Sequence, residues 1–300
     1  MKSFWLLIFP FFAFCSELED QTKLFKTRDF VWVKGFFSKD EVKLLKTWAD
    51  RAQKDGQEAL FLSHTLARPL SEQIKMFADK PIVVPERNDE LQVCRVEDLM
   101  SSYPDLGHFI EETLLDYLGR LTGEPYVAFK DKLNFKWPGG GAFPYHQDYP
   151  AFEVFGPREH ISVMVCIDPA TIENGCLQVA SNWRETFKGE LGIDQDLLAE
   201  GKVVLEYIEG GPMHGTIVSE LTDQIDWIPV TADAGDVVFF TSYVPHYSEP
   251  NRSDSSRRAL ILTFNRLVDG EHKAFYYETK RNDPENPMFH FGTPTNARNK

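Results

Sequence analysis

Several features are scarce or missing in this 300-residue sequence, and each absence excludes a class of protein. No segment contains the roughly 20 consecutive apolar residues that a membrane-spanning helix needs, so we expect no stable membrane span in the mature chain. The sequence also has no excess of positive charge. Its formal net charge is −14, which argues against nucleic acid and anionic membrane surfaces as partners. The four cysteines, at positions 15, 94, 166 and 176, form no Cys-x-x-Cys pair. We expect the last three to be reduced and mostly buried.

The chain contains enough apolar residues for a sizeable core, at 42% of the sequence. A capping box at Ser38–Glu41 predicts a helix that ends near Gly56, and an amphipathic pattern predicts a second helix over 105–121. A further helical piece is expected over 70–77. From Tyr126 onward the pattern indicates roughly eight short strands, with a hairpin-type turn at 174–175. This order is typical of a mainly β protein with flanking helices (α+β), and without repeats or long linkers we expect one domain over 25–290.

The most informative residues are His146 and Asp148. If the strand that begins near Lys130 continues through Asp148, the period of two places both side chains on the same face. A third ligand is expected from His246, which follows the strand-like run 237–240. Two histidines and one carboxylate form the facial triad of non-haem Fe(II) oxygenases, which leaves positions open on the metal. Arg257 opens a later strand, where its guanidinium is suited to binding the carboxylate of a keto-acid cosubstrate.

Each of these signals is weak alone. His and Asp often share an exposed strand face, His246 is also compatible with a capped loop, and Arg257 with a surface charge. Their combination in this order, at domain-scale spacing, favours a metal site. A cupin-like binding protein that holds zinc or no metal is the alternative from another class, and the cationic side chains argue against it.

With these residues placed, the chain resembles the phytanoyl-CoA dioxygenase family of Fe(II)/2-oxoglutarate oxygenases from about Val31 to Lys280. Within that family it looks most like the branch of 2-aminoethylphosphonate dioxygenase. The segments that carry the likeness are 132–136, 146–148, 173–177, 234–240, 245–246 and 256–260, with 160–165 and 276–281 for the branch.

The resemblance implies a double-stranded β-helix, the jelly roll of the cupins. It implies Fe(II) on His146, Asp148 and His246, 2-oxoglutarate on Arg257, and O2 as the oxidant. The alternating strand 126–137 would then place three further residues on the cosubstrate and substrate side, namely Lys130, Lys132 and Asn134. A halogenase on this scaffold is disfavoured, because that chemistry usually replaces the carboxylate that Asp148 supplies. The sequence carries no signal for oligomeric state.

For the substrate, the resemblance and the nearby cations predict a small charged molecule, and an aminophosphonate is one candidate. Lys130, Lys132 and Arg266 are the cations in question, although Lys132 could instead pair with Asp131 or Glu153. An acyl-CoA hydroxylase of the same family is the alternative. Residues 180–183 differ from the family's usual turn, and residues 282–285 from its usual ending, which leaves substrate identity open. The aromatic residues Phe143, Tyr145, Tyr149 and Phe152 either wall the pocket or belong to the core. Gln147 is expected to face away locally, although the family pattern puts it near the pocket.

The N-terminus has the pattern of a secretory signal peptide over residues 1–16. A positive start precedes a short apolar run and then small residues. A strand or helix docked on the core is the alternative. A signal peptide favours export, whereas Fe(II) and 2-oxoglutarate are mainly cytoplasmic resources, so the sequence leaves the location open.

Overall fold

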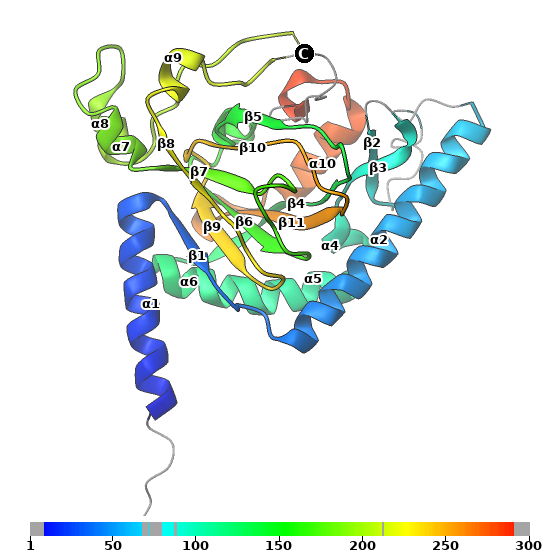
Figure 1. The fold of residues 1–300 in the computed structure, drawn as a ribbon, viewed down its shortest axis with the longest axis horizontal. Coiled ribbons are helices and arrows are strands. Elements are labelled where there is room, and N and C mark those ends of the chain that lie inside the picture. The colour runs from blue at the N-terminus through cyan, green and yellow to red at the C-terminus, as the bar shows by residue number, and fades with distance from the viewer. Residues whose placement is uncertain (1–8, 68–71, 73–79, 87–88, 212, 291–300) are drawn as a thin grey trace, which may run out of the picture.

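The computed structural model describes residues 9–67, 72, 80–86, 89–211 and 213–290, and eleven strands there form two antiparallel sheets (Figure 1). The larger sheet has the order β1-β9-β6-β11-β4-β3-β2 and the smaller one β5-β10-β7-β8. The strands are β1 Phe30–Val33, β2 Ile82–Glu86, β3 Asp89–Glu97, β4 Tyr126–Lys136, β5 Phe143–His146, β6 His160–Cys166, β7 Leu177–Ser181, β8 Asp226–Pro229, β9 Val237–Thr241, β10 His246–Ser248 and β11 Arg257–Arg266.

The two sheets face each other across an apolar layer. Met164 and Phe240 from the larger sheet pack there with Leu177 and Val179 from the smaller one, and all four are buried. Alternation along β4 explains how one strand serves two environments: Leu133 and the other odd-numbered residues of its second half are buried, whereas the even-numbered side chains face the space between the sheets. The predicted double-stranded β-helix is confirmed.

Helices cover the outer face of the larger sheet, where a second apolar core lies (Figure 1). The longest is α2, which begins at the predicted capping box. The predicted helix over 105–121 is a composite of an α-helix, a π-helical segment and a second α-helix. The helices are α1 Phe9–Arg28, α2 Lys39–Thr65, α4 Leu99–Ser102, α5 Pro104–Ile110, α6 Asp116–Thr122, α7 Trp183–Thr186, α8 Gln195–Ala199, α9 Ser219–Thr222 and α10 Lys273–Asn282, with a π-helix at Glu111–Leu115.

Three sequence predictions of the fold are wrong or fall outside the described residues. Helix α2 does not end near Gly56 but continues to Thr65, and the glycine permits close approach of β3, since a Cβ there would lie 3.1 Å from a methyl group of Val96. Strands β2 and β3 were not predicted from the sequence. Pro85 is tolerated because β2 is an edge strand. The turn at 174–175 joins strands of different sheets and not a hairpin, and the expected helix over 70–77 falls largely outside the described residues.

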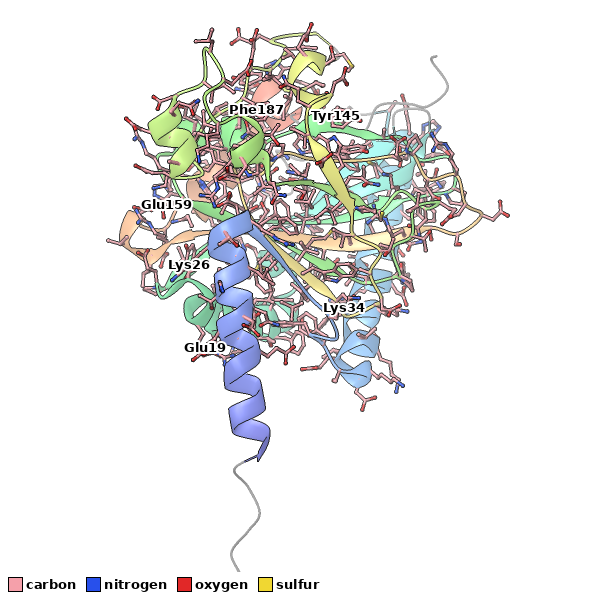
Figure 2. The ribbon with its side chains drawn as sticks, turned by 60° about the vertical axis from the view of Figure 1, so that its left-hand side comes forward. Glu19, Lys26, Lys34, Tyr145, Glu159 and Phe187 are labelled. Atoms are coloured by element: carbon pink, nitrogen blue, oxygen red, sulfur yellow. The ribbon has the colours of Figure 1, made fainter. Side chains whose placement is uncertain are left out.

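Helix α1 packs against β1 and α6 (Figure 1). Its C-terminal half is anchored by buried Phe25 and by a 2.6 Å hydrogen bond from the Tyr117 hydroxyl to Gln21. Figure 2 shows Glu19 and Lys26 along this helix, beside the body of the protein. In the described part of the chain, no helix has both the length and the apolar character needed to cross a membrane. The signal peptide over residues 1–16 stays a prediction.

Candidate active site

Two neighbouring strands of the smaller sheet bring His146 and His246 together. The residues are register partners in β5 and β10, and their ring centroids lie 4.2 Å apart. Each ring contacts a backbone carbonyl through Nδ1, at 2.6 Å to Pro144 O and 2.9 Å to Val244 O. A carbonyl can only accept, so the proton of each neutral ring lies on Nδ1 and the Nε2 lone pair is free. Both imidazoles therefore present a ligand atom to the space between the sheets.

Asp148 completes the group, but not by strand alternation as the sequence predicted. Strand β5 ends at His146, and Asp148 has a helical backbone conformation at the start of a short 3-10 turn. Its Oδ1 lies 3.8 Å from Nε2 of His146 and 3.9 Å from Nε2 of His246. The Ser162 hydroxyl from β6 donates a 2.6 Å hydrogen bond to the other oxygen. This contact orients the carboxylate so that Oδ1 faces both histidines.

These three groups fit a metal ion in geometry and in charge state. Their ligand atoms all lie within 4.8 Å of one another. Two atoms that each bind one metal at about 2.1 Å can be at most about 4.2 Å apart, so small movements of the side chains would allow all three to bind one ion. Burial and the neighbouring His246 lower the pKa of His146 to about 3. Although burial opposes it, the two histidines keep the pKa of Asp148 below its usual value. The site thus offers two imidazoles and one carboxylate, the donor set of the facial triad.

A cavity extends from this triad to two buried cations of the larger sheet. Arg257 from β11 is 7% exposed and donates a 3.0 Å hydrogen bond to the carbonyl of Gly175. Lys136 from β4 lies beside it and donates a 2.6 Å hydrogen bond to the Ser248 hydroxyl. The next residue, Arg258, points the other way and is ion-paired with Asp168 at 2.7 Å.

The three residues predicted to lie on one face of β4 do not all line the cavity. Lys132 and Asn134 line the cavity, and the side-chain oxygen of Asn134 is buried without a hydrogen-bond partner among the described residues. Lys132 pairs with neither Asp131 nor Glu153, the two acids considered from the sequence, since no ion pair joins it to a described residue. Lys130 is not part of this wall and lies with its nitrogen 4.3 Å from the centroid of the Phe152 ring.

Comparison with known proteins identifies the family. Residues 28–259 match phytanoyl-CoA dioxygenase (PhyH). The chain belongs to this family. It is 34% identical over 264 residues to 2-aminoethylphosphonate dioxygenase of Uncultured bacterium HF130_AEPn_1, and the alignment covers 88% of this chain and 87% of that protein. It is 39% identical over 166 residues to methylphosphonate hydroxylase of Gimesia maris, and this alignment covers 55% of each protein.

Solved structures support the fold. EctD from S. alaskensis in its apoform matches with a TM-score of 0.59 at 19% identity, over 83% of this chain and 77% of that one. AviO1 from Streptomyces viridochromogenes Tue57 matches with a TM-score of 0.57 at 20% identity, over 85% and 97%. With the family and the triad together, the chain is an Fe(II)- and 2-oxoglutarate-dependent dioxygenase that uses O2.

Some residues singled out from the sequence of the dioxygenase lie away from the cavity. Arg266 is at the far end of β11, where it pairs with Asp269, Glu124 and Glu159, so its expected place near the pocket is wrong. Gln147 is buried and holds the loop after α8, accepting from Leu205 N at 2.8 Å and donating to Val203 O at 3.0 Å. Of the four aromatic residues proposed as a wall, Phe143 lines the cavity, Tyr145 packs against Trp227 and Tyr247, and Tyr149 and Phe152 belong to apolar clusters.

Sequence reasoning missed other polar residues that border the site. Lys136 continues the alternation of Lys132 and Asn134, so the period of two was a usable signal for it. Ser162 is the one hydroxyl in an apolar strand, a weaker signal. Arg95 and Glu97 lie on β3, and without a predicted strand there nothing in the sequence directed them inward.

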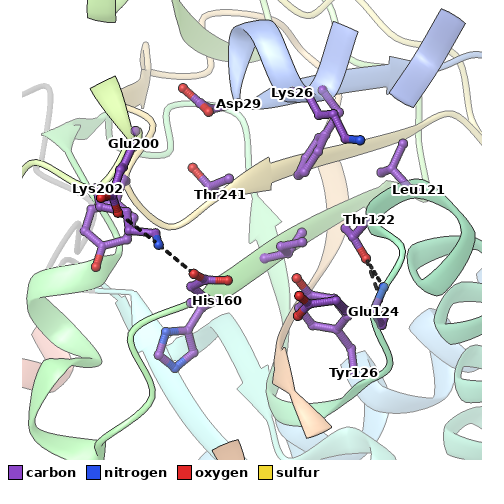
Figure 3. Close-up of a pocket in the computed structure, with 15 residues that line it drawn as sticks. Lys26, Asp29, Leu121, Thr122, Glu124, Tyr126, His160, Glu200, Lys202 and Thr241 are labelled. Carbon is purple, nitrogen blue, oxygen red and sulfur yellow. Dashed lines mark hydrogen bonds and ion pairs between the residues drawn. The ribbon is translucent and has the colours of Figure 1, made fainter. Parts of the chain in front are cut away.

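A second cavity lies where the end of α1 approaches β6 and β9, and Figure 3 shows Lys26, Asp29 and Thr241 in its wall. Most of its charged groups are satisfied locally: Lys202 pairs with Glu159 at 2.7 Å, and Asp29 with Arg184 at 2.8 Å. Among the described residues, the only group of metal-ligating side chains is the triad, so this cavity offers no comparable centre.

Proposed function

We propose that this dioxygenase hydroxylates a small phosphonate or a similarly compact charged compound, with release of succinate and CO2. The observation that carries the proposal is the shared cavity, whose wall contains the triad at one end and Arg257 with Lys136 at the other. The two relatives described above are named for phosphonate substrates. A locally cationic cavity in a chain of net charge −14 is suited to anionic ligands.

His146, Asp148 and His246 are the proposed ligands of Fe(II). The free Nε2 atoms and Oδ1 converge, and Ser162 holds the carboxylate in this orientation. Bound Fe(II) would supply the activation of O2 and the coupled oxidative decarboxylation of the keto acid. The protein residues supply the fixed donor geometry and leave the remaining positions of the metal open.

Arg257 is the proposed anchor for the distal carboxylate of 2-oxoglutarate. Its guanidinium is buried, and its one hydrogen bond among the described residues goes to a neutral carbonyl. A buried cation without a carboxylate partner is costly, and a bound carboxylate offsets that cost through charge-assisted hydrogen bonds. Lys136 is the proposed second cation at this end, while Lys132 and Asn134 lie on the wall between this end and the triad.

Turnover tests the proposal directly. The purified protein is supplied with Fe(II), O2 and 2-oxoglutarate, together with 2-aminoethylphosphonate, methylphosphonate or an acyl-CoA, and succinate and the oxidised product are quantified. We expect succinate formation to rise with a phosphonate and the product to gain one oxygen atom. The His246→Ala variant should form no product, whereas Lys202→Met, a change at the second cavity, should retain activity. Faster turnover of the acyl-CoA than of every small charged compound would refute the substrate assignment.

A further inference from the structure

A second group of buried charges lies next to the triad, on β3 and α10. Arg95 and Glu97 of β3 form an ion pair at 2.8 Å, and Lys280 of α10 binds the same carboxylate at 2.7 Å. The three residues are 5%, 3% and 4% exposed. Although burial opposes it, Lys280 and Arg95 hold the pKa of Glu97 well below its usual range, so the carboxylate is ionised.

Two lysines of β4 extend this group toward the metal ligands. Lys132 is the register partner of Glu97, so the two side chains are neighbours on the inner face of the sheet. Lys130 lies two residues along on the same face, with its nitrogen 4.3 Å from the Phe152 centroid and 5.6 Å from that of Tyr276. Neither lysine has an ion-pair partner among the described residues.

The charges of this group do not balance. Four basic side chains, Arg95, Lys130, Lys132 and Lys280, interact with two carboxylates, Glu97 and Asp148. Burial lowers the pKa of Lys130 to about 7 and that of Lys280 to about 8, although the Glu97 carboxylate raises both. The Asp148 carboxylate raises the pKa of both Lys130 and Lys132 by charge attraction, so the group borders the proposed iron site.

The cosubstrate does not account for this excess. Its proposed distal anchor is Arg257 with Lys136, which face the other end of the cavity. Its keto-acid end would be neutralised at the metal. A second anion would offset the remaining positive charge, and a doubly charged one matches several basic side chains better than a single carboxylate does.

We infer that Arg95, Lys130, Lys132 and Lys280 form the subsite that binds a phosphonate group of the substrate beside Asp148. This inference rests on the proposed function and specifies where the substrate's charge is held. Glu97 positions Arg95 and Lys280 by pairing with both. A compact phosphonate bound here would have its adjacent C–H bond close to the metal, which explains how a small substrate is held without a long apolar tail.

Binding measured without turnover tests the subsite. Anaerobic calorimetry with the Fe(II)- and 2-oxoglutarate-loaded enzyme gives the affinity for methylphosphonate. We expect Lys132→Met and Lys280→Met each to weaken it by roughly 10- to 100-fold, the effect of losing one charge-assisted hydrogen bond. Lys132→Met breaks no internal ion pair and so separates binding from folding. Lys202→Met, the same substitution at the second cavity, should leave the affinity unchanged.

A further comparison separates this inference from the proposed function. Inorganic phosphate should compete with methylphosphonate in the wild type and lose that ability in Lys132→Met. If the wild type binds phosphonate through these lysines but hydroxylates no phosphonate, the subsite stands and the proposed function fails. Unchanged phosphonate affinity in both lysine variants overturns the subsite, whatever the enzyme hydroxylates.

Discussion

Replacing Arg257 with methionine tests its proposed role as the anchor of the cosubstrate, separately from metal binding. The guanidinium is 7% exposed and, among the described residues, has no carboxylate partner. Burial lowers the pKa of Arg257, which shows that the unliganded protein bears a cost for this charge. Methionine retains much of the side-chain volume without the charge, so the folded protein should tolerate it.

The size of the effect follows from the burial of the pair. Removing one partner of a buried, hydrogen-bonded charge pair costs about 2–5 kcal/mol. At about 1.4 kcal/mol per tenfold, the dissociation constant of 2-oxoglutarate should rise roughly 30- to 3,000-fold. Affinity for Fe(II) should stay close to wild type, because the triad comes from the smaller sheet and the loop after β5, and none of its ligand atoms contacts Arg257.

The measurement is anaerobic titration of the iron-loaded protein with 2-oxoglutarate, followed by calorimetry. Arg258→Met is the matched control: this neighbour faces outward and pairs with Asp168, so its loss should lower stability but leave cosubstrate affinity intact. Thermal unfolding gives a second readout, since a saturating ligand should raise the Tm of the wild type much more than that of Arg257→Met. A dissociation constant for 2-oxoglutarate within threefold of wild type in Arg257→Met would refute the assignment.

Three further predictions concern the residues that support the site. Ser162→Ala removes the hydrogen bond that orients Asp148, and metal titration should show Fe(II) affinity about 10- to 100-fold lower. Gly175→Ala should lower the free energy of unfolding by at least about 1–3 kcal/mol in chemical denaturation, because φ is +71° and a Cβ would lie 2.2 Å from the Glu249 carbonyl oxygen; an unchanged denaturation midpoint would contradict this. Burial raises the pKa of Asp131 from 3.8 to about 6, so the folded state binds this proton more tightly than the unfolded state does. Stability should therefore fall as pH rises from about 4 to about 6, and Asp131→Asn should lose this component in denaturation curves recorded across that range.

The convergence of His146, Asp148 and His246, the proposed metal ligands, could be predicted from the sequence because the chemistry of such a site restricts the residue types and the order of strands. The route to Asp148 was wrong, since the strand ends at His146 and a turn delivers the carboxylate. Asp148 still lies beside His146, because a turn at this position directs the side chain of the second residue to the same side as strand alternation would. Arg257 and Arg258 differ in environment because adjacent strand residues face opposite sides.

The charged residues of β3 and α10 could not be predicted, and the reason is long-range contact. Arg95 and Glu97 have the polar character of an exposed segment, and only pairing with β4 turns them inward. Lys280 lies on a mostly polar helix whose buried face is defined by its contact with β4. Local patterns identify the faces of an element, whereas burial of a charge depends on partners distant in sequence.

The proposed metal ligands and the proposed cosubstrate anchor come mainly from different sheets, and this has a structural consequence. Both histidines belong to the smaller sheet, and the cations that would hold the cosubstrate belong to the larger one. The distance between the proposed iron site and the proposed carboxylate anchor therefore depends on the packing of the apolar layer that includes Met164 and Val179. A smaller side chain in that layer would therefore change this distance while leaving the triad and Arg257 themselves intact.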